Sequence, residues 1–157
     1  MQLRIIGDGP ERGVLEKQAR DLKVQDRVEF IGALPQAELP RYYAECSVFV
    51  LPSIREGMGL VLAEALLCGA PVIAANSGGV TDIVKDGETG LLVPERDAQA
   101  IANAITRILN DRALATRLVE NGYKFVQERY TQERVAEQFV KVYESVKRDK
   151  QYAIRNT

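Results

Sequence analysis

Short apolar runs that end at glycine or proline alternate with stretches of helical periodicity through the first part of this chain. The apolar runs are rich in branched side chains and comprise residues 3–6, 28–31, 48–51, 72–74 and 91–93. Runs this short and this apolar are typical of strands buried in a parallel sheet. A chain built this way is constrained to pack helices against a sheet.

Helical periodicity fills two of the connections between these runs. One apolar face comprises Val14, Leu15, Ala19 and Leu22, and the other comprises Leu60, Ala63, Leu67 and Cys68, with Glu64 as its polar member. Alternating strands and helices indicate an α/β fold, and we predict a Rossmann-like doubly wound parallel sheet. Ligands bind at the carboxyl ends of such strands, so the turns 7–10, 32–34, 52–59 and 76–79 are expected to share one rim.

Beyond Pro94 the pattern is helical only. An apolar stripe over 101–109 follows Asp97, and a second helical stretch over 112–128 follows Asp111, both residues of a type that starts helices. A last apolar face comprises Val135, Phe139, Val142, Tyr143 and Val146. Thr131 is followed by Arg134 where a capping box would need Glu, so the box is absent. We assign residues 1–147 to one domain and 148–157 to a polar tail that frays.

The amino-acid composition argues against several classes of function for this chain. The 157 residues include 21 Lys and Arg against 22 Asp and Glu, and 6% are aromatic, which argues against a nucleic acid partner. No histidine is present, so imidazole cannot act as base or metal ligand within this chain. Cys46 and Cys68 are interpreted as buried reduced thiols. Without a secretory signal or an apolar run of about 20 residues, the protein is expected to be cytoplasmic.

A glycine-rich turn follows the first predicted strand. Gly7, Gly9 and Gly13 are spaced G-x-G-x-x-x-G before a helix, which invites a dinucleotide-binding interpretation. That interpretation needs an acidic residue at the end of the next strand, which instead ends at Gly32. Pro10 also suits a first helical position, so a plain tight turn is favoured and a dehydrogenase is only a third choice.

The segment after the third predicted strand carries the most chemistry. Gly57 and Gly59 leave room for a ligand against the backbone, and the helix start that follows can bind a diphosphate through free N–H groups. Glu56 lies in the loop, and Glu64 lies on an apolar helical face. A carboxylate there needs hydrogen-bond donors, which ribose hydroxyls would supply. An isolated Glu64 would instead reach solvent or an Arg, but its neighbours favour the functional interpretation.

Residues 53–65 read S-x-x-E-G-x-G-L-x-x-x-E-A, and Gly69-Ala-Pro71-Val-Ile-Ala74 follows. This pattern resembles the donor-binding domain of the retaining group 1 glycosyltransferases, which have the two-domain GT-B fold. Further similarity extends in order over nearly the whole chain, through residues 6–10, 28–32, 48–53, 78–79, 86–94 and a closing helix up to Glu144. The family's usual Glu after the paired glycines is Asp82 here.

The resemblance implies a role for each matching residue. Glu64 is expected to bind the ribose of a UDP- or GDP-linked sugar, and Glu56, the implied catalytic residue, to hydrogen-bond the transferred hexose. The backbone N–H groups of Gly57, Met58, Gly59 and Leu60 would contact the sugar and diphosphate. Main chain at Gly32 and Leu34 would border the base, beside the turn at Gly7 and Gly9. The family needs no protein-bound metal and no cofactor beyond the nucleotide-sugar donor.

Other parts of the family pattern have no counterpart here. Relatives carry an earlier strand and helix with an Arg and a Lys at the diphosphate, and a preceding acceptor-binding domain with a His. The absent strand would be central in the sheet and would leave unpaired edges, so self-association or a domain supplied in cis or in trans is expected.

The resemblance implies an enzyme of glycan biosynthesis, such as that of the cell envelope or an exopolysaccharide. The chain would be the donor-binding half of a retaining hexosyltransferase and inactive alone. The alternative is a non-catalytic module or partner subunit that holds a nucleotide sugar. Basic residues from Lys141 to Arg155 beside an apolar face suggest peripheral membrane contact of the parent enzyme, although docking onto a domain is favoured.

Overall fold

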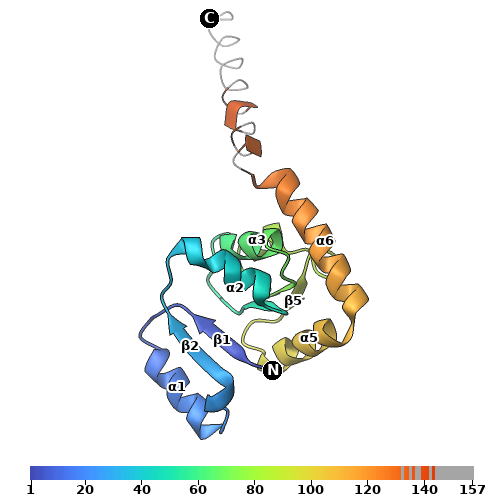
Figure 1. The fold of residues 1–157 in the computed structure, drawn as a ribbon. Coiled ribbons are helices and arrows are strands. Elements are labelled where there is room, and N and C mark those ends of the chain that lie inside the picture. The colour runs from blue at the N-terminus through green and yellow to red at the C-terminus, as the bar shows by residue number, and fades with distance from the viewer. Residues whose placement is uncertain (132, 135, 137–138, 142, 144–157) are drawn as a thin grey trace, which may run out of the picture. The chain divides into compact units, whose positions relative to one another are not determined.

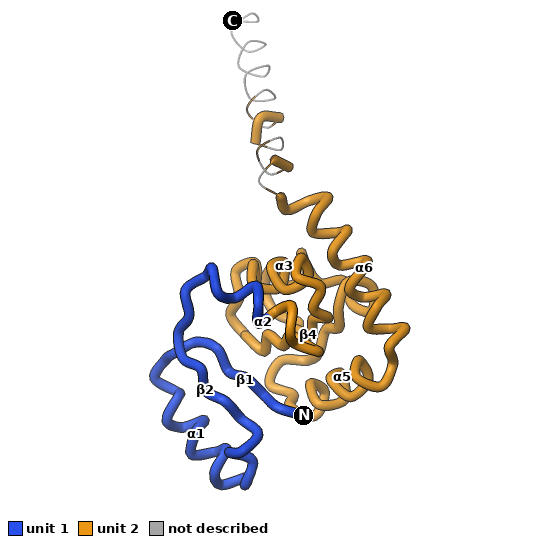
Figure 2. The backbone as a smooth tube through the Cα atoms, in the orientation of Figure 1, with its two compact units in different colours: residues 1–42 blue, residues 43–157 orange. Residues whose placement is uncertain are grey.

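The computed structural model describes residues 1–131, 133–134, 136, 139–141 and 143. It is an α/β structure whose backbone contacts divide the chain into two compact units, residues 1–42 (unit 1) and residues 43–157 (unit 2) (Figures 1 and 2). Every strand pairing within each sheet is parallel, as the sequence predicts. In the part of the chain that the structure describes, five strands form two sheets, one of two strands and one of three.

Unit 1 is built on a strand–helix–strand connection. Strand β1 (Leu3–Ile6) pairs with β2 (Val28–Gly32), with Leu3 opposite Val28. Helix α1 (Arg12–Asp21) and the 3-10 turn η1 (Gln25–Arg27) connect them, and a second 3-10 turn, η2 (Gln36–Glu38), follows β2. These strand positions agree with the two apolar runs.

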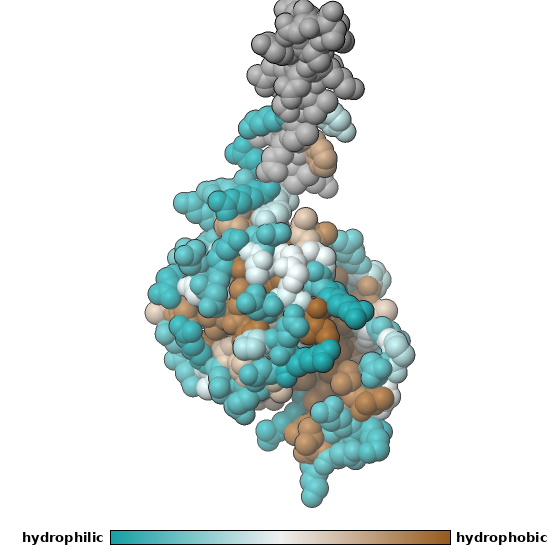
Figure 3. Space-filling view, turned by 180° about the vertical axis from the view of Figure 1, so that it is seen from behind, coloured by the Kyte–Doolittle hydropathy of each residue, from teal (hydrophilic) through white to brown (hydrophobic). Residues whose placement is uncertain are grey.

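The apolar face predicted for α1 is not buried as expected. Val14, Leu15 and Leu22 remain 60%, 40% and 64% exposed, and only Ala19 is buried. Figure 3 shows apolar side chains at several places on the surface seen from behind. A two-stranded sheet offers too little apolar surface to cover a whole helical face, which is the physical reason for the difference.

Unit 2 contains the three-stranded sheet. Its strands are β3 (Phe49–Leu51), β4 (Val72–Ala75) and β5 (Leu91–Val93), in the order β3-β4-β5. Helix α3 (Leu60–Leu67) connects β3 to β4, and the short helix α4 (Val80–Ile83) lies between β4 and β5. All four residues of β4 are buried, and alternate residues of a strand point to opposite faces, so both faces of this central strand are covered.

Two long helices complete the core of unit 2. Helices α5 (Ala98–Asn110) and α6 (Arg112–Arg129) follow β5 (Figure 1). The Asp97 carboxylate accepts from the N–H of Ala100 at 2.8 Å, and that of Asp111 accepts from Leu114 at 2.9 Å, so both predicted helix starts are confirmed. Their apolar faces meet β4 and β5 in one buried cluster, which comprises Ile73, Leu91, Val93, Ala104, Ile108, Leu114 and Leu118.

The buried face of α3 differs from the predicted one. Leu60 and Leu67 are 60% and 42% exposed, whereas Leu62 and Leu66 are completely buried. The helix is apolar on nearly every side, so periodicity alone could not select the face that packs. Helix α2 (Leu39–Glu45) and helix α4 were not predicted, because each is only one or two turns long.

The two cysteines are free and half-buried rather than fully buried. Near the end of the described chain, the Thr131 hydroxyl accepts from the N–H of Arg134 at 3.4 Å. The predictions that fall on positions 135, 142, 146 and 148–157 lie outside the described residues. Within the described part of the chain, no helix is both long and apolar enough to cross a membrane.

Candidate functional site

The loop from β3 to α3 is shaped by its last glycine. Gly59 precedes the first residue of α3 with φ +70°, a left-handed conformation that glycine adopts without strain. A Cβ at this position would lie 2.9 Å from the Leu62 side chain. Gly59 therefore serves the turn itself rather than only ligand approach. Gly57 differs, since a Cβ there would meet no atom within 4 Å, which leaves open space beside the backbone.

A second loop, residues 76–79, supports the first. The buried hydroxyl of Ser77 donates to the carbonyl of Ile54 at 2.7 Å, and the N–H of Gly79 donates to the carbonyl of Glu56 at 3.3 Å. A Cβ on Gly78 would overlap the Glu56 carbonyl, and one on Gly79 would overlap that of Gly57. Glycine at both positions thus lets the two loops pack backbone to backbone, and the predicted shared rim is confirmed for these two turns.

The start of α3 presents backbone donors at this rim. The N–H of Leu62 already bonds the Gly59 carbonyl at 2.8 Å. The N–H groups that precede it have no acceptor within the helix, because helix geometry gives them none. Together with the helix dipole, they favour an anion. Met58 and Leu60, which flank Gly59, are 45% and 60% exposed.

Glu64 lies one turn into α3 and is held by a tyrosine from α2. The Tyr43 hydroxyl donates to Oε2 of Glu64 at 3.2 Å. Tyr43 is buried, and this burial, followed by the charge of Glu64 and the hydrogen bond to it, raises the pKa of Tyr43 well above the ordinary 10.0. The tyrosine is therefore a neutral donor to the Glu64 carboxylate, which lies on a half-buried helix face.

Glu56 has a different environment. Among the residues that the structure describes, no side chain hydrogen-bonds or ion-pairs with its carboxylate, although its carbonyl accepts from Gly79. It is half-buried beside Gly59, whose added Cβ would lie 3.4 Å from Cγ of Glu56. One segment thus offers an oriented carboxylate, an uncommitted carboxylate and a helix N-terminus.

The turns of unit 1 form their own rim. The N–H of Gly7 donates to the carbonyl of Gly32 at 2.8 Å, which joins the ends of β1 and β2. The N–H of Gly9 is held by the Asp8 carboxylate at 2.8 Å, and Leu34 is half-buried just after β2. The structure brings these two predicted turns together, and the rim shared by all four turns stays a prediction.

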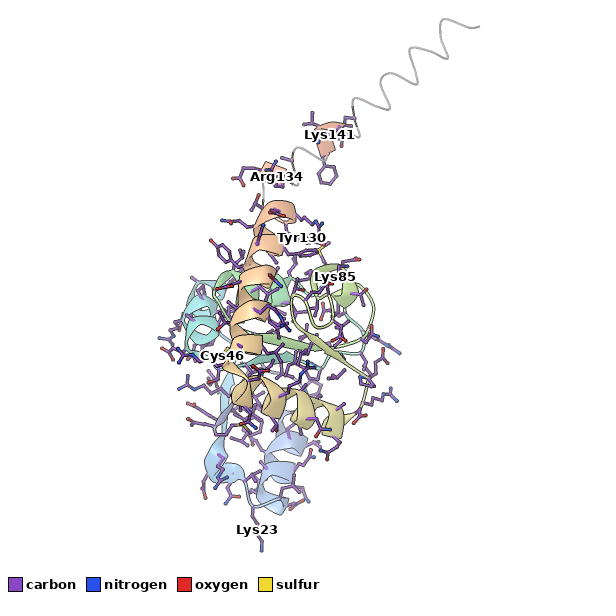
Figure 4. All side chains as sticks on the ribbon, turned by 90° about the vertical axis from the view of Figure 1, so that its right-hand side faces the viewer. Lys23, Cys46, Lys85, Tyr130, Arg134 and Lys141 are labelled. Atoms are coloured by element: carbon purple, nitrogen blue, oxygen red, sulfur yellow. The ribbon has the colours of Figure 1, made fainter. Side chains whose placement is uncertain are left out.

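Helix α4 is anchored by the end of α6. The Tyr130 hydroxyl donates to the carbonyl of Asp82 at 3.0 Å, and the ammonium of Lys85 lies 5.9 Å from the centre of the Phe125 ring. Figure 4 shows Lys85 and Tyr130 at the same end of α6. The guanidinium of Arg129 stacks on that ring at 4.2 Å. Of these contacts, the Tyr130 bond holds the helix that follows the Ser77–Gly79 loop, and the Lys85 contact holds the residues just after that helix.

Two residues of this site were missed by sequence reasoning. Tyr43 lies in a helix too short for periodicity to detect, and it reaches Glu64 over 21 positions of sequence. Ser77 was included only in a predicted turn. The sequence did hold a signal for Ser77, because a serine followed by paired glycines at the end of a buried strand is typical of close backbone packing.

Comparison with known proteins identifies the family. The family model for glycosyl transferases group 1 matches residues 1–125. The N-acetyl-alpha-D-glucosaminyl L-malate synthase of Bacillus anthracis is 32% identical over 94% of this chain and 38% of its own length. The GDP-mannose-dependent alpha-(1-6)-phosphatidylinositol monomannoside mannosyltransferase of Mycobacterium tuberculosis is 38% identical over 79% of this chain and 34% of its own length.

A solved structure of similar fold also matches this chain. Anabaena Alr3699/HepE, in complex with UDP, matches with a TM-score of 0.85 and 28% identity, over 92% of this chain and 41% of that one. The chain thus spans well under half the length of these relatives. The family model covers most of the chain, including both loops of the site and all of α3, and the resemblance read from residues 53–65 is confirmed. This chain belongs to the group 1 glycosyltransferase family.

Proposed function

We propose that this chain is the donor-binding half of a retaining glycosyltransferase, which transfers a hexose from a UDP- or GDP-linked sugar when joined to an acceptor-binding domain. The observation that carries the proposal is the segment from Glu56 to Glu64. It combines two carboxylates with a helix N-terminus, and the Ser77–Gly79 loop supports its backbone. Relatives named for GDP-mannose and solved with UDP support a nucleotide-linked donor and keep both bases open.

Each group in the segment has a task in the proposed reaction. Glu64 accepts from the ribose hydroxyls, and Glu56 accepts from hydroxyls of the transferred sugar. When the glycosidic bond breaks, negative charge develops on the leaving diphosphate. The N–H groups from Gly57 to Leu60 lie in the loop before α3 and at its first residue, beside the positive end of the helix dipole, so they stabilise this charge without reorganisation. In this scheme no metal ion is required.

The two carboxylates can be tested separately. Glu64→Ala should weaken the binding of UDP (or GDP) and of the corresponding sugar nucleotide, each by about 1.5–3 kcal/mol, the range for hydrogen bonds to a charged group. Glu64→Gln should lose less, because it keeps one acceptor. Glu56→Ala should weaken the binding of the sugar nucleotide and leave the binding of UDP or GDP unchanged. Saturation-transfer NMR titrations measure all of these affinities, with NADH as a ligand that should not bind.

The exposed Glu120→Ala on α6 is the matched control and should change neither affinity. Equal binding by the wild type and both site variants would contradict the proposal. A transfer assay with mixed UDP- and GDP-sugars, with and without EDTA, then separates an enzyme from a non-catalytic module. The chain contains no histidine to act near the donor sugar. We therefore expect transfer only when an acceptor-binding domain is supplied, and equal rates with EDTA.

A further inference from the structure

Tyr43 is held firmly by its surroundings. Its ring packs edge-on against Phe49 of β3, with 5.2 Å between the centroids and an interplanar angle of 89°. Its carbonyl accepts from the N–H of Cys46 at 3.4 Å and from the Cys46 thiol at 3.3 Å. Only 5% of the residue is exposed. The position of its hydroxyl is therefore determined by the core and the end of α2 rather than by solvent.

The Tyr43 hydroxyl restricts the orientation of Glu64 through its hydrogen bond. A glutamate side chain has several rotatable bonds, and ordering it costs conformational entropy. The bond from Tyr43 to Oε2 restricts those rotations before any ligand arrives. A carboxylate has about four acceptor sites, so one bond from Tyr43 does not exhaust its capacity to accept from ribose hydroxyls.

We propose that Tyr43 is a positioning residue for the nucleotide site, whose hydroxyl orients the Glu64 carboxylate toward the ribose hydroxyls of the donor. This inference rests on the proposed role of Glu64 in binding ribose. The physical gain is preorganisation: the cost of ordering Glu64 is met during folding, so the binding step is relieved of it. Tyr43 itself need not touch the nucleotide.

The test compares ribose with dideoxyribose ligands. For each variant, NMR titration gives dissociation constants for UDP and 2′,3′-dideoxy-UDP, and for the guanosine pair. The ratio of the two constants reports only the hydroxyl contacts. If Tyr43 had a purely structural role, its substitution would weaken the binding of both ligands by the same factor and leave the ratio unchanged. Tyr43→Phe keeps the ring against Phe49 and removes only the hydroxyl, so the fold is retained, as circular dichroism should verify.

We expect the wild type to prefer the ribose ligand and Glu64→Ala to lose that preference. Tyr43→Phe should reduce the preference by about 3- to 10-fold, the effect of one net hydrogen bond. Adding Tyr43→Phe to Glu64→Ala should cause no further loss. Tyr123→Phe is the matched control, because its hydroxyl contacts Gln127 on α6, and it should behave as wild type.

The failures are distinguishable. If the wild type does not bind these nucleotides, or if its preference survives Glu64→Ala, the proposed function of Glu64 is wrong and the inference is overturned with it. If the preference depends on Glu64 but is unchanged by Tyr43→Phe, only the role of Tyr43 is overturned. A further loss from Tyr43→Phe in the Glu64→Ala background would also overturn it, because Tyr43 would then act independently of Glu64.

Discussion

The N–H of Gly79 donates to the carbonyl of Glu56 at 3.3 Å, and this bond joins the two loops that follow β3 and β4. There is no room for a side chain at the contact, since a Cβ on Gly79 would overlap the Gly57 carbonyl. The backbone that carries Glu56 and leads into α3 therefore depends on a residue outside its own loop.

Gly79→Ala should displace the loop that carries Glu56 and Gly57. Because the obstructing atoms are backbone, relief requires a shift of one loop, and we expect a loss of stability on the order of 1–3 kcal/mol. Affinity for UDP or GDP should fall as well, since the start of α3 moves with the loop. Urea denaturation and nucleotide titration measure the two effects.

Gly13→Ala is the control for this substitution. Gly13 lies in α1, where an added Cβ would meet nothing within 4 Å. Alanine is the better helix former by roughly 1 kcal/mol, so this variant should be as stable as wild type or more so. If Gly79→Ala behaved like Gly13→Ala, the backbone packing between the loops would be unimportant.

Stability should decline in alkali, with Tyr43 as one cause. Burial raises the pKa of Tyr43 in the folded state, so the neutral hydroxyl stabilises the fold fully below the ordinary pKa of 10.0. Above that pH the unfolded chain loses the proton first, and the free energy of unfolding should fall by up to about 1.4 kcal/mol per pH unit. Tyr43→Phe should flatten this part of the profile in urea titrations.

Other groups contribute to the same decline and define its controls. Burial also raises the pKa values of Cys46, Cys68 and Tyr130 above their ordinary values. The double variant Cys46→Ala/Cys68→Ala should therefore remove a loss of stability that begins above pH 9.0. An unchanged slope above pH 10 in Tyr43→Phe would mean that Tyr43 is not deprotonated on unfolding in the way described.

Asp111 links the two long helices. Its carboxylate accepts from the N–H of Leu114 at the start of α6, while its own N–H donates to the carbonyl of Arg107 at the end of α5. Asp111→Ala removes only the first bond and should cost about 1 kcal/mol, whereas Asp111→Asn should be nearly neutral. Equal denaturation midpoints for Asp111→Ala and wild type would contradict this role.

Gly122 allows α6 to approach α3 closely. A Cβ there would overlap the buried side chain of Leu66 and lie 3.0 Å from the Thr89 carbonyl. Gly122→Ala should therefore lower the thermal midpoint, although alanine favours helix by roughly 1 kcal/mol, because overpacking a filled core costs on the order of 1–3 kcal/mol. A higher midpoint than wild type would show that Leu66 repacks without strain.

The order of the strands and of the longer helices was readable from the sequence because its signals are local. Branched apolar runs closed by glycine or proline predicted all five strands to within a residue at either end. Asp97 and Asp111 marked the starts of α5 and α6 through capping, which involves only the next three residues. The family was evident for the same reason, since its most informative pattern lies within the segment 53–65 and the further matches are short local runs.

Contacts between distant segments were decided by the tertiary structure. The sequence put Glu64 on an apolar face, but the hydrogen bond from the Tyr43 hydroxyl to Glu64 forms only when the chain is folded. Likewise, the buried side of α3 depends on which of its many apolar residues pack against other elements. The division into two sheets depends on which strands pair with one another. Local propensity acts over a few residues, whereas these arrangements minimise the free energy of the whole packed core.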